Sequence, residues 1–222
     1  MFFYFRNIHS IQDILHCGTQ TIGEFLDELA SGYAAPGGGA GAALAGAMGA
    51  ALMSMSTNLT INRKKYAEVH QEMRTIRERT EAIRSEMTNL AQLDAHVFER
   101  VMAAYRMARQ SETQQSVRTA AIQNTLMDAT QVPLKVAVQA SELFDYAATL
   151  ASKGNRNAIG DLGVGLLLAD TAMRSALISV EINLKLIKDE AFKEGVQARV
   201  EELLVGRDEL KAQVMAEVQA NL

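Results

Sequence analysis

PGGGAGAALAGAMGAALMSMSTNLT, residues 36–60, is the stretch that decides the fold. It belongs to a longer segment, 31–60, that has no formally charged side chain. Alanine is the strongest helix former, and aromatic strand formers are absent here, so we predict a helix over residues 40–58. Small side chains on this helix let the axes of neighbouring helices approach closely: Gly41, Ala42, Ala45, Gly46, Gly49 and Ala50. The stretch therefore predicts a close-packed helix inside a bundle or dimer.

Two other interpretations of this stretch have less support. The letters GGGAGA match the dinucleotide-binding pattern G-x-G-x-x-A, but that pattern needs a buried strand before it, and Pro36 and SGYAA precede it instead. A membrane span would be long enough, but its centre is alanine and glycine rather than large apolar side chains. The free N–H groups where the loop Gly37–Gly39 leads into the helix are a candidate site for an anionic or carbonyl group.

The composition predicts an all-α, single-domain helical bundle with long amphipathic helices. The chain has 222 residues, only two prolines and no alternating strand pattern, and we assign residues 19–222 to this domain and 1–18 to an N-terminal extension. A net charge of −4 offers no basic surface for nucleic acid. The single cysteine, Cys17, excludes an internal disulfide and a thiolate metal cluster, so we expect a reducing cytoplasm.

A long helix is predicted from Tyr66 to about Met107. Its apolar residues are spaced alternately four and three apart, which is typical of one buried helix face: Val69, Met73, Ile76, Ile83, Met87, Leu90, Val97, Val101 and Ala104. Thr80 also lies on this stripe, and we expect its hydroxyl to bond to its own helix. The same spacing places a carboxylate, Asp94, on the apolar face.

Asp94 is the sharpest functional candidate that the spacing gives. A carboxylate on an apolar face loses hydration, so its pKa should rise unless cations or donors compensate. General acid/base catalysis needs a carboxyl group that titrates near neutrality. The structural alternative is that Asp94 pairs with an arginine or caps a neighbouring helix, and spacing alone leaves both readings open.

The remaining helices follow from the same patterns. A short helix is opened by Thr21 in TIGEFLDELA, two separate helices are expected over 117–129 and 133–152, with Pro133 in a first turn, and a buried helix is expected over 162–187. Residues 153–161, KGNRNAIGD, are predicted to form a loop.

Several polar residues outside the long helix are weaker candidates. Arg63, Lys64 and Lys65 are either a solvated loop or a device that captures a carboxylated substrate. Asn155 and Asp161 suit turn and N-cap positions, as does Asn157. An amide in an apolar helix, Asn183, needs a hydrogen-bond partner. The four histidines have no metal-ligand spacing.

Six segments occur in the order found in the formiminotetrahydrofolate cyclodeaminase family, which this chain resembles over roughly residues 20–200. The family includes the C-terminal domain of formimidoyltransferase-cyclodeaminase and stand-alone methenyltetrahydrofolate cyclohydrolases. The segments are PGGGAGAALAGAMGAALMSMSTNLT, KKY, LDAHVFERVMAAYRM, VPL, GNRNAIGDLGVG and INLKLIKDEAF. The resemblance implies an all-helical homodimer with a folate site between helices, and it places the family's catalytic aspartate on Asp94.

The resemblance also implies a reaction and a set of binding residues. The reaction is the conversion of 5-formiminotetrahydrofolate to 5,10-methenyltetrahydrofolate and ammonia, a step of histidine degradation, with a tetrahydrofolate derivative as substrate and neither a covalently bound cofactor nor a metal. The implied substrate-binding residues are Gly37, Gly38, Gly39, Asn58, Arg63, Lys64, Lys65, Asn155, Asp161 and Asn183.

Two alternatives to the deaminase remain open at this point. One is a methenyltetrahydrofolate cyclohydrolase that uses the same pocket, and the other is a non-catalytic folate-binding or interaction paralogue. The chain departs from the family pattern at several polar positions, which bears on this choice: Ala40, Gln92, Ala108, Gly160 and Ser179.

Overall fold

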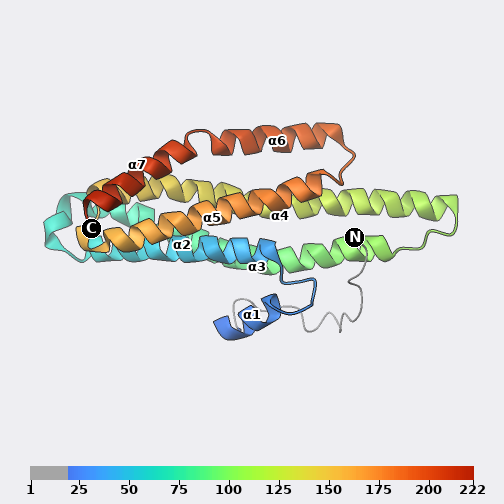
Figure 1. Cartoon of the computed structure of the whole chain (residues 1–222), viewed down its shortest axis with the longest axis horizontal. Helices are drawn as coiled ribbons and strands as arrows, with labels where there is room; N and C mark the ends of the chain where they lie inside the picture. Colours follow the sequence, from blue (N-terminus) through green and yellow to red (C-terminus); the bar gives the residue numbers. More distant parts are fainter. Residues whose placement is uncertain (1–19) are drawn as a thin grey trace.

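The structure, a computed structural model, describes residues 20–222, and the predicted N-terminal extension lies outside this part of the chain. All regular secondary structure in it is helical, which confirms the all-α prediction (Figure 1). The elements are α1 (Ile22–Leu29), α2 (Gly38–Ile61), η2 (Lys64–Val69), α3 (His70–Arg106), α4 (Glu112–Lys153), η3 (Arg156–Ala158), α5 (Ile159–Leu184), α6 (Glu190–Leu204) and α7 (Arg207–Ala220).

Helices α2 to α5 form an up-and-down bundle, with α6 and α7 along one side and α1 on the opposite side (Figure 1). The antiparallel course of α3 and α4 is marked by salt bridges at both ends, from Lys153 to Glu72 at 2.7 Å and from Arg100 to Asp128 at 2.6 Å. The predicted apolar stripe of α3 faces the core, and Met73, Ile83 and Met87 are fully buried there.

Helix α2 is the close-packed helix that its composition predicts, and it is longer than predicted at both ends. It crosses α5 at Gly49, where a Cβ atom would lie 2.8 Å from the carbonyl oxygen of Gly165. At Gly46 a Cβ atom would lie 2.3 Å from the sulfur of Met87 on α3. Gly49 therefore sets the close approach of α2 to α5, because a side chain there would meet the backbone of α5, whereas a side chain at Gly46 would require the end of Met87 to move.

The prediction of two separate helices around Pro133 is wrong, since α4 continues through this residue. Proline has no N–H, so the carbonyl of Ala129, four residues earlier, loses its helical partner. The side-chain Nδ2 of Asn183 on α5 donates a hydrogen bond to that carbonyl oxygen at 3.3 Å. A neighbouring helix thus supplies the missing donor. The carbonyl of Ala129 is in turn the hydrogen-bond partner that we expect for the amide of Asn183.

Two helical segments are long and apolar enough to cross a membrane by length and composition alone. They are α2 and residues 156–184, and 50% and 44% of their most apolar windows are buried inside the bundle. Bundle packing therefore accounts for about half of each window.

Candidate active site

Asp94 lies against the N-terminus of α2. The N-cap residue of that helix, Gly37, contributes no side-chain hydrogen bond, so the first-turn N–H groups need other acceptors. The backbone N–H of Ala40 donates to the Asp94 carboxylate. A Cβ atom at Gly39 would lie 2.4 Å from Oδ1 of Asp94 and 2.6 Å from its Cγ. The carboxylate thus occupies the space that any side chain at position 39 would need.

The register of α2 against α3 brings these groups together. Near the far end of α2 the hydroxyls of Ser54 and Thr80 lie 2.8 Å apart, and Gly46 contacts Met87 further along. Continuing the same antiparallel register by two turns places Asp94 beside the first turn of α2. The expectation for Thr80 is confirmed, because its hydroxyl donates to the carbonyl of Arg77 within its own helix at 3.1 Å.

The surroundings of Asp94 favour its protonated form. The side chain is half-buried and makes no salt bridge with any residue from 20 to 222. Burial raises the pKa of the Asp94 carboxyl, and the Ala40 N–H opposes this rise to a smaller extent. A carboxyl with a raised pKa holds its proton more readily than an ordinary aspartate, which is the direction that a general acid requires.

The sequence leaves two interpretations of Asp94 open, a catalytic acid/base group and a structural group that caps a helix or pairs with an arginine. The carboxylate caps a neighbouring helix, as the structural alternative holds, and no arginine neutralises it among the described residues. Its raised pKa and its position beside Gly39 are compatible with acid/base chemistry.

The basic candidates lie far from Asp94. Arg63, Lys64 and Lys65 follow the C-terminus of α2, and all three are exposed. The helix between them and Asp94 has 24 residues, which at 1.5 Å per residue separates its two ends by about 35 Å. Within one chain these cations and Asp94 cannot contact the same part of a small molecule.

Asn58 and Asn155 lie at this distant end of α2, and both have structural partners. Asn155 is buried, its backbone N–H donates to Oγ1 of Thr60 at 2.9 Å, and its Nδ2 donates to the carbonyl of Leu59 at 3.0 Å. Oδ1 of Asn58 accepts a bond from Arg77 at 3.4 Å. The predicted cap role of Asn155 is confirmed, since its side chain caps η3. The predicted loop over 153–161 is wrong for most of its length, because η3 begins at Arg156 and α5 at Ile159.

The other two candidates lie on α5, near its opposite ends. Asp161 is exposed in the first turn of α5, at the end of the bundle that holds Asn155. Asn183 lies in the last turn, and the antiparallel packing of α5 on α2 brings it toward the end that holds Asp94. The structure therefore gathers Asp94, the loop Gly37–Gly39 and Asn183 at one end, and the remaining candidates at the other.

The interaction between the main-chain N–H of Ala40 and Asp94 is part of the candidate site that the sequence does not predict, because it involves no side chain of Ala40. The glycine loop indicates free N–H groups at this helix start, but residue identity does not show which of them meets Asp94. Among residues 20–222 there is also no group of three or more histidine, cysteine or acidic side chains that could hold a metal ion.

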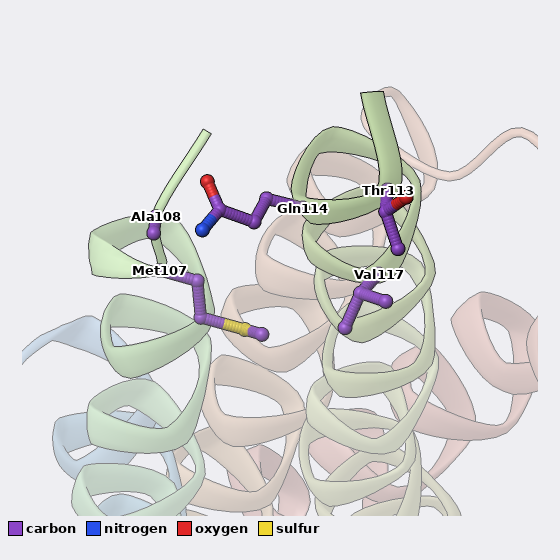
Figure 2. Close-up of a pocket in the computed structure, with 5 residues that line it drawn as sticks. All are labelled: Met107, Ala108, Thr113, Gln114 and Val117. Carbon is purple, nitrogen blue, oxygen red and sulfur yellow. The ribbon is translucent and has the colours of Figure 1, made fainter. Parts of the chain in front are cut away.

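A shallow pocket lies between the end of α3 and the start of α4, away from these residues. It is lined by Met107, Ala108, Thr113, Gln114 and Val117 (Figure 2). None of these five side chains is ionisable, and Asp94 is about 20 Å away along α3. The pocket offers no acid/base group and is not part of the candidate site.

Comparisons with known proteins point in one direction. The family model described as "Formiminotransferase-cyclodeaminase" matches residues 21–202. A methenyltetrahydrofolate cyclohydrolase from Methylorubrum extorquens is 40% identical over 205 residues, which cover 92% of this chain and 99% of that protein. The formimidoyltransferase-cyclodeaminase of Rattus norvegicus is 33% identical over 88% of this chain, and the match spans only 36% of its own length.

A solved structure gives the same result for the fold. The formiminotetrahydrofolate cyclodeaminase of Thermotoga maritima superposes with a TM-score of 0.83 at 32% sequence identity, covering 91% of this chain and 98% of that one. The match therefore extends over nearly the whole of both chains, including the helices that carry the candidate site.

Proposed function

The chain belongs to the formiminotransferase-cyclodeaminase family, and from this membership we propose that it is a folate one-carbon enzyme that hydrolyses 5,10-methenyltetrahydrofolate to 10-formyltetrahydrofolate. The observation that carries the choice of reaction is the 40% identity to a methenyltetrahydrofolate cyclohydrolase over nearly the full length of both proteins. The observation that carries the chemistry is the half-buried Asp94, with a raised pKa, at the N-terminus of α2.

Asp94 acts first as a base and then as an acid in this reaction. Ionised Asp94 takes a proton from a water molecule as the water oxygen bonds to the carbon bridging N5 and N10. The tetrahedral adduct keeps a hydroxyl group. Protonated Asp94 then gives its proton to N5 as the C–N5 bond breaks, and the hydroxyl proton passes to solvent, which leaves a formyl group on N10. One proton is released overall, and the positive charge of the methenyl bridge disappears with it.

Deamination of 5-formiminotetrahydrofolate is the second candidate, supported by the similarity to the Thermotoga maritima cyclodeaminase. Here N10 attacks the carbon of the protonated formimino group (=NH2+), whose nitrogen becomes an NH2 group on the tetrahedral adduct, and Asp94 takes the N10 proton; the positive charge ends on the methenyl bridge when ammonia leaves. Asp94 then donates it to the departing nitrogen, because ammonia leaves far more readily than amide ion. Both reactions use the same carboxyl in the same two roles, so the site geometry supports them equally.

The binding roles are part of the same proposal. The loop Gly37–Gly39 lets a flat ring approach the backbone beside Asp94. Arg63, Lys64 and Lys65 suit the carboxylates of a folate tail in chemistry, but within one chain the length of α2 keeps them about 35 Å from Asp94. The scheme needs no resident cofactor. We place the enzyme in the cytoplasm, in keeping with its single cysteine, and we propose that it forms the homodimer that the resemblance implies.

The methenyl bridge absorbs near-ultraviolet light, and this separates the candidates in one assay. The protein is incubated with each folate in turn, and the chromophore is followed. Its enzyme-dependent loss from methenyltetrahydrofolate supports the hydrolase, and its appearance from formiminotetrahydrofolate supports the deaminase. Folate binding without turnover would point to a non-catalytic paralogue, and the absence of any binding would refute the assignment to folate chemistry.

A further inference from the structure

The short segment between α5 and α6 carries a lysine that has no charge partner. Lys188 is exposed and makes no salt bridge with any residue from 20 to 222. The charged side chains around it are engaged, since Lys185 pairs with Glu181 at 2.9 Å and Asp189 caps the start of α6. Lys188 therefore has a positive charge that no neighbour in the described chain neutralises.

The backbone around Lys188 is held in place by α4. The side-chain amide of Gln123 bonds twice to this segment: its Oε1 accepts from the N–H of Lys188 at 2.7 Å, and its Nε2 donates to the carbonyl oxygen of Leu186 at 3.1 Å. The residue between them, Ile187, is buried. A solvated lysine needs no such anchoring, whereas a fixed backbone lowers the entropy that is lost when a ligand binds.

Lys188 lies beyond Asp94 toward the same end of the bundle, where α5 connects to α6 (Figure 1). Two contacts between α3 and α4 flank Gln123 and fix its level along the bundle: Arg118 with Tyr105, and Asp128 with Arg100. Gln123 is therefore level with about Met102 of α3, eight residues past Asp94, which is about 12 Å along the bundle at 1.5 Å per residue.

The separation of Lys188 from Asp94 suits a single folate molecule. An offset of about 12 Å along the bundle and one helix spacing of about 10 Å across it place the backbone of Lys188 about 16 Å from Asp94. An extended lysine side chain spans about 6 Å, so its ammonium group can lie about 10 Å from the carboxyl. In a folate, an aminobenzoyl ring and an amide separate the one-carbon unit from the first glutamate carboxylate, which is also about 10 Å by ordinary bond lengths.

We propose that Lys188 binds the first glutamate carboxylate of the folate in the same chain whose Asp94 acts on the one-carbon unit, and that Gln123 is a positioning residue for this lysine. The inference rests on the proposed function and deepens it, because it names the group that selects a folate with its glutamate over a pterin without one. The ammonium group donates a charge-assisted hydrogen bond to the carboxylate. It takes no part in the chemical step, so its removal weakens binding and leaves kcat unchanged.

Kinetics with two substrates test the role of Lys188. One substrate is 5,10-methenyltetrahydrofolate, and the other is the same compound with its glutamate replaced by a neutral amide. Lys188→Gln should raise KM about tenfold for the first substrate and leave KM for the second unchanged. Lys188→Arg keeps the charge and should hold KM for the first within about threefold of wild type. An equal rise for both substrates, or no rise for either, would overturn the proposal.

Lys135→Gln is the matched control. Lys135 lies on α4, is exposed, and likewise makes no salt bridge within residues 20–222. The variant removes the same charge from the protein as Lys188→Gln does, so it should keep the wild-type KM for both substrates. A rise in KM for the glutamate-bearing folate as large as that of Lys188→Gln would mean that net charge, and not the position of Lys188, determines binding.

Gln123→Ala tests the positioning role separately. The change frees the backbone around Lys188 and keeps its charge, so KM for the glutamate-bearing folate should rise about threefold to tenfold, with kcat and the KM for the amide compound unchanged. A purely structural role for Gln123 would alter both substrates alike. Wild-type KM values for both would refute the positioning role.

A binding measurement keeps this inference separable from the proposed reaction. Titration calorimetry with tetrahydrofolate needs no turnover, and Lys188→Gln should raise its Kd about tenfold. If this rise is found in a protein that turns over neither folate, only the proposed function is refuted. If the wild type is active and Lys188→Gln binds tetrahydrofolate as tightly as the wild type does, only the inference is refuted. A wild-type chain that binds no tetrahydrofolate refutes both.

Discussion

Replacing Gly39 with alanine tests the position of Asp94 without altering any ionisable group. The added Cβ atom would start 2.4 Å from Oδ1 of Asp94, against 3.4 Å or more for an ordinary contact. The carboxyl is the end of a short side chain, so it must move away by about 1 Å, and a displacement of that size can cost about a hundredfold in rate. We expect kcat to fall by about that factor, equivalent to roughly 2.7 kcal/mol of transition-state stabilisation.

Folding stability should change little in the same variant. Alanine stabilises a helix by up to about 1 kcal/mol relative to glycine, and the weakened hydrogen bond from the Ala40 N–H costs a similar amount. The combination of retained stability and lost activity distinguishes a displaced catalytic group from a damaged fold. Gly195→Ala on α6 is the control, because nothing lies within 4 Å of a Cβ there, and this variant should keep full activity.

Two measurements decide the outcome. The methenyl assay gives kcat and KM, and urea unfolding gives the free energy of unfolding for both variants. A double variant, Gly39→Ala with Asp94→Asn, should be no less active than Asp94→Asn alone, since both changes act on one group. Wild-type kcat in Gly39→Ala, or a double variant in which the two losses multiply, would refute the idea that Gly39 acts by positioning Asp94.

Further predictions concern the same contacts. Because burial raises the pKa of Asp94 in the folded protein, its ionised form destabilises the fold, so stability falls as pH rises from the ordinary aspartate range through the raised value. Asp94→Asn should therefore be more stable than wild type in urea unfolding at about pH 8, lose that advantage below about pH 4, and be about 10²- to 10⁴-fold less active. Gly49→Ala should lower the free energy of unfolding by about 1–3 kcal/mol, measured by thermal unfolding, because the new Cβ atom meets backbone. Gly46→Ala should lower it less, although its contact is shorter, because the new Cβ atom meets the movable end of a methionine. Equal losses of stability in the two variants would contradict this. Asn183→Leu should destabilise by about 1–3 kcal/mol by leaving a buried carbonyl unpaired, and an unchanged urea midpoint would show that the carbonyl finds another donor.

Local patterns were sufficient to predict most of the fold. The stripe from Val69 to Ala104 depends on spacing within one helix, and the alanine and glycine content of α2 sets its close packing, so both follow from neighbouring residues. Pro133 shows where such patterns fail. The hydrogen bond that it removes from α4 is replaced from α5 by Asn183, and a contact between distant helices cannot be found from the residues flanking the proline.

In the candidate site too, features that depend on neighbouring residues are predictable and contacts between distant helices are not. Asp94 was identified because it interrupts an apolar stripe, which is a local signal. Its contact with the Ala40 N–H depends on the register of α2 against α3, and that register is set by packing at Gly46 and by the pair of Ser54 and Thr80. Lys64 and Asp94 lie at opposite ends of α2, and this separation follows from the length of the helix, which the sequence does contain.

The bond from Ala40 to Asp94 has a consequence for how this site tolerates mutation. It is made by a main-chain N–H, so a change of side chain at position 40 leaves the donor in place, and proline is the one residue that removes it. Ala40 is one of the positions at which the chain departs from the family pattern, and this departure leaves the main-chain donor in place. Position 39 is constrained in the opposite way, because its role depends on having no side chain. Substitutions can therefore accumulate at residue 40 while the pair Gly39 and Asp94 has to persist together.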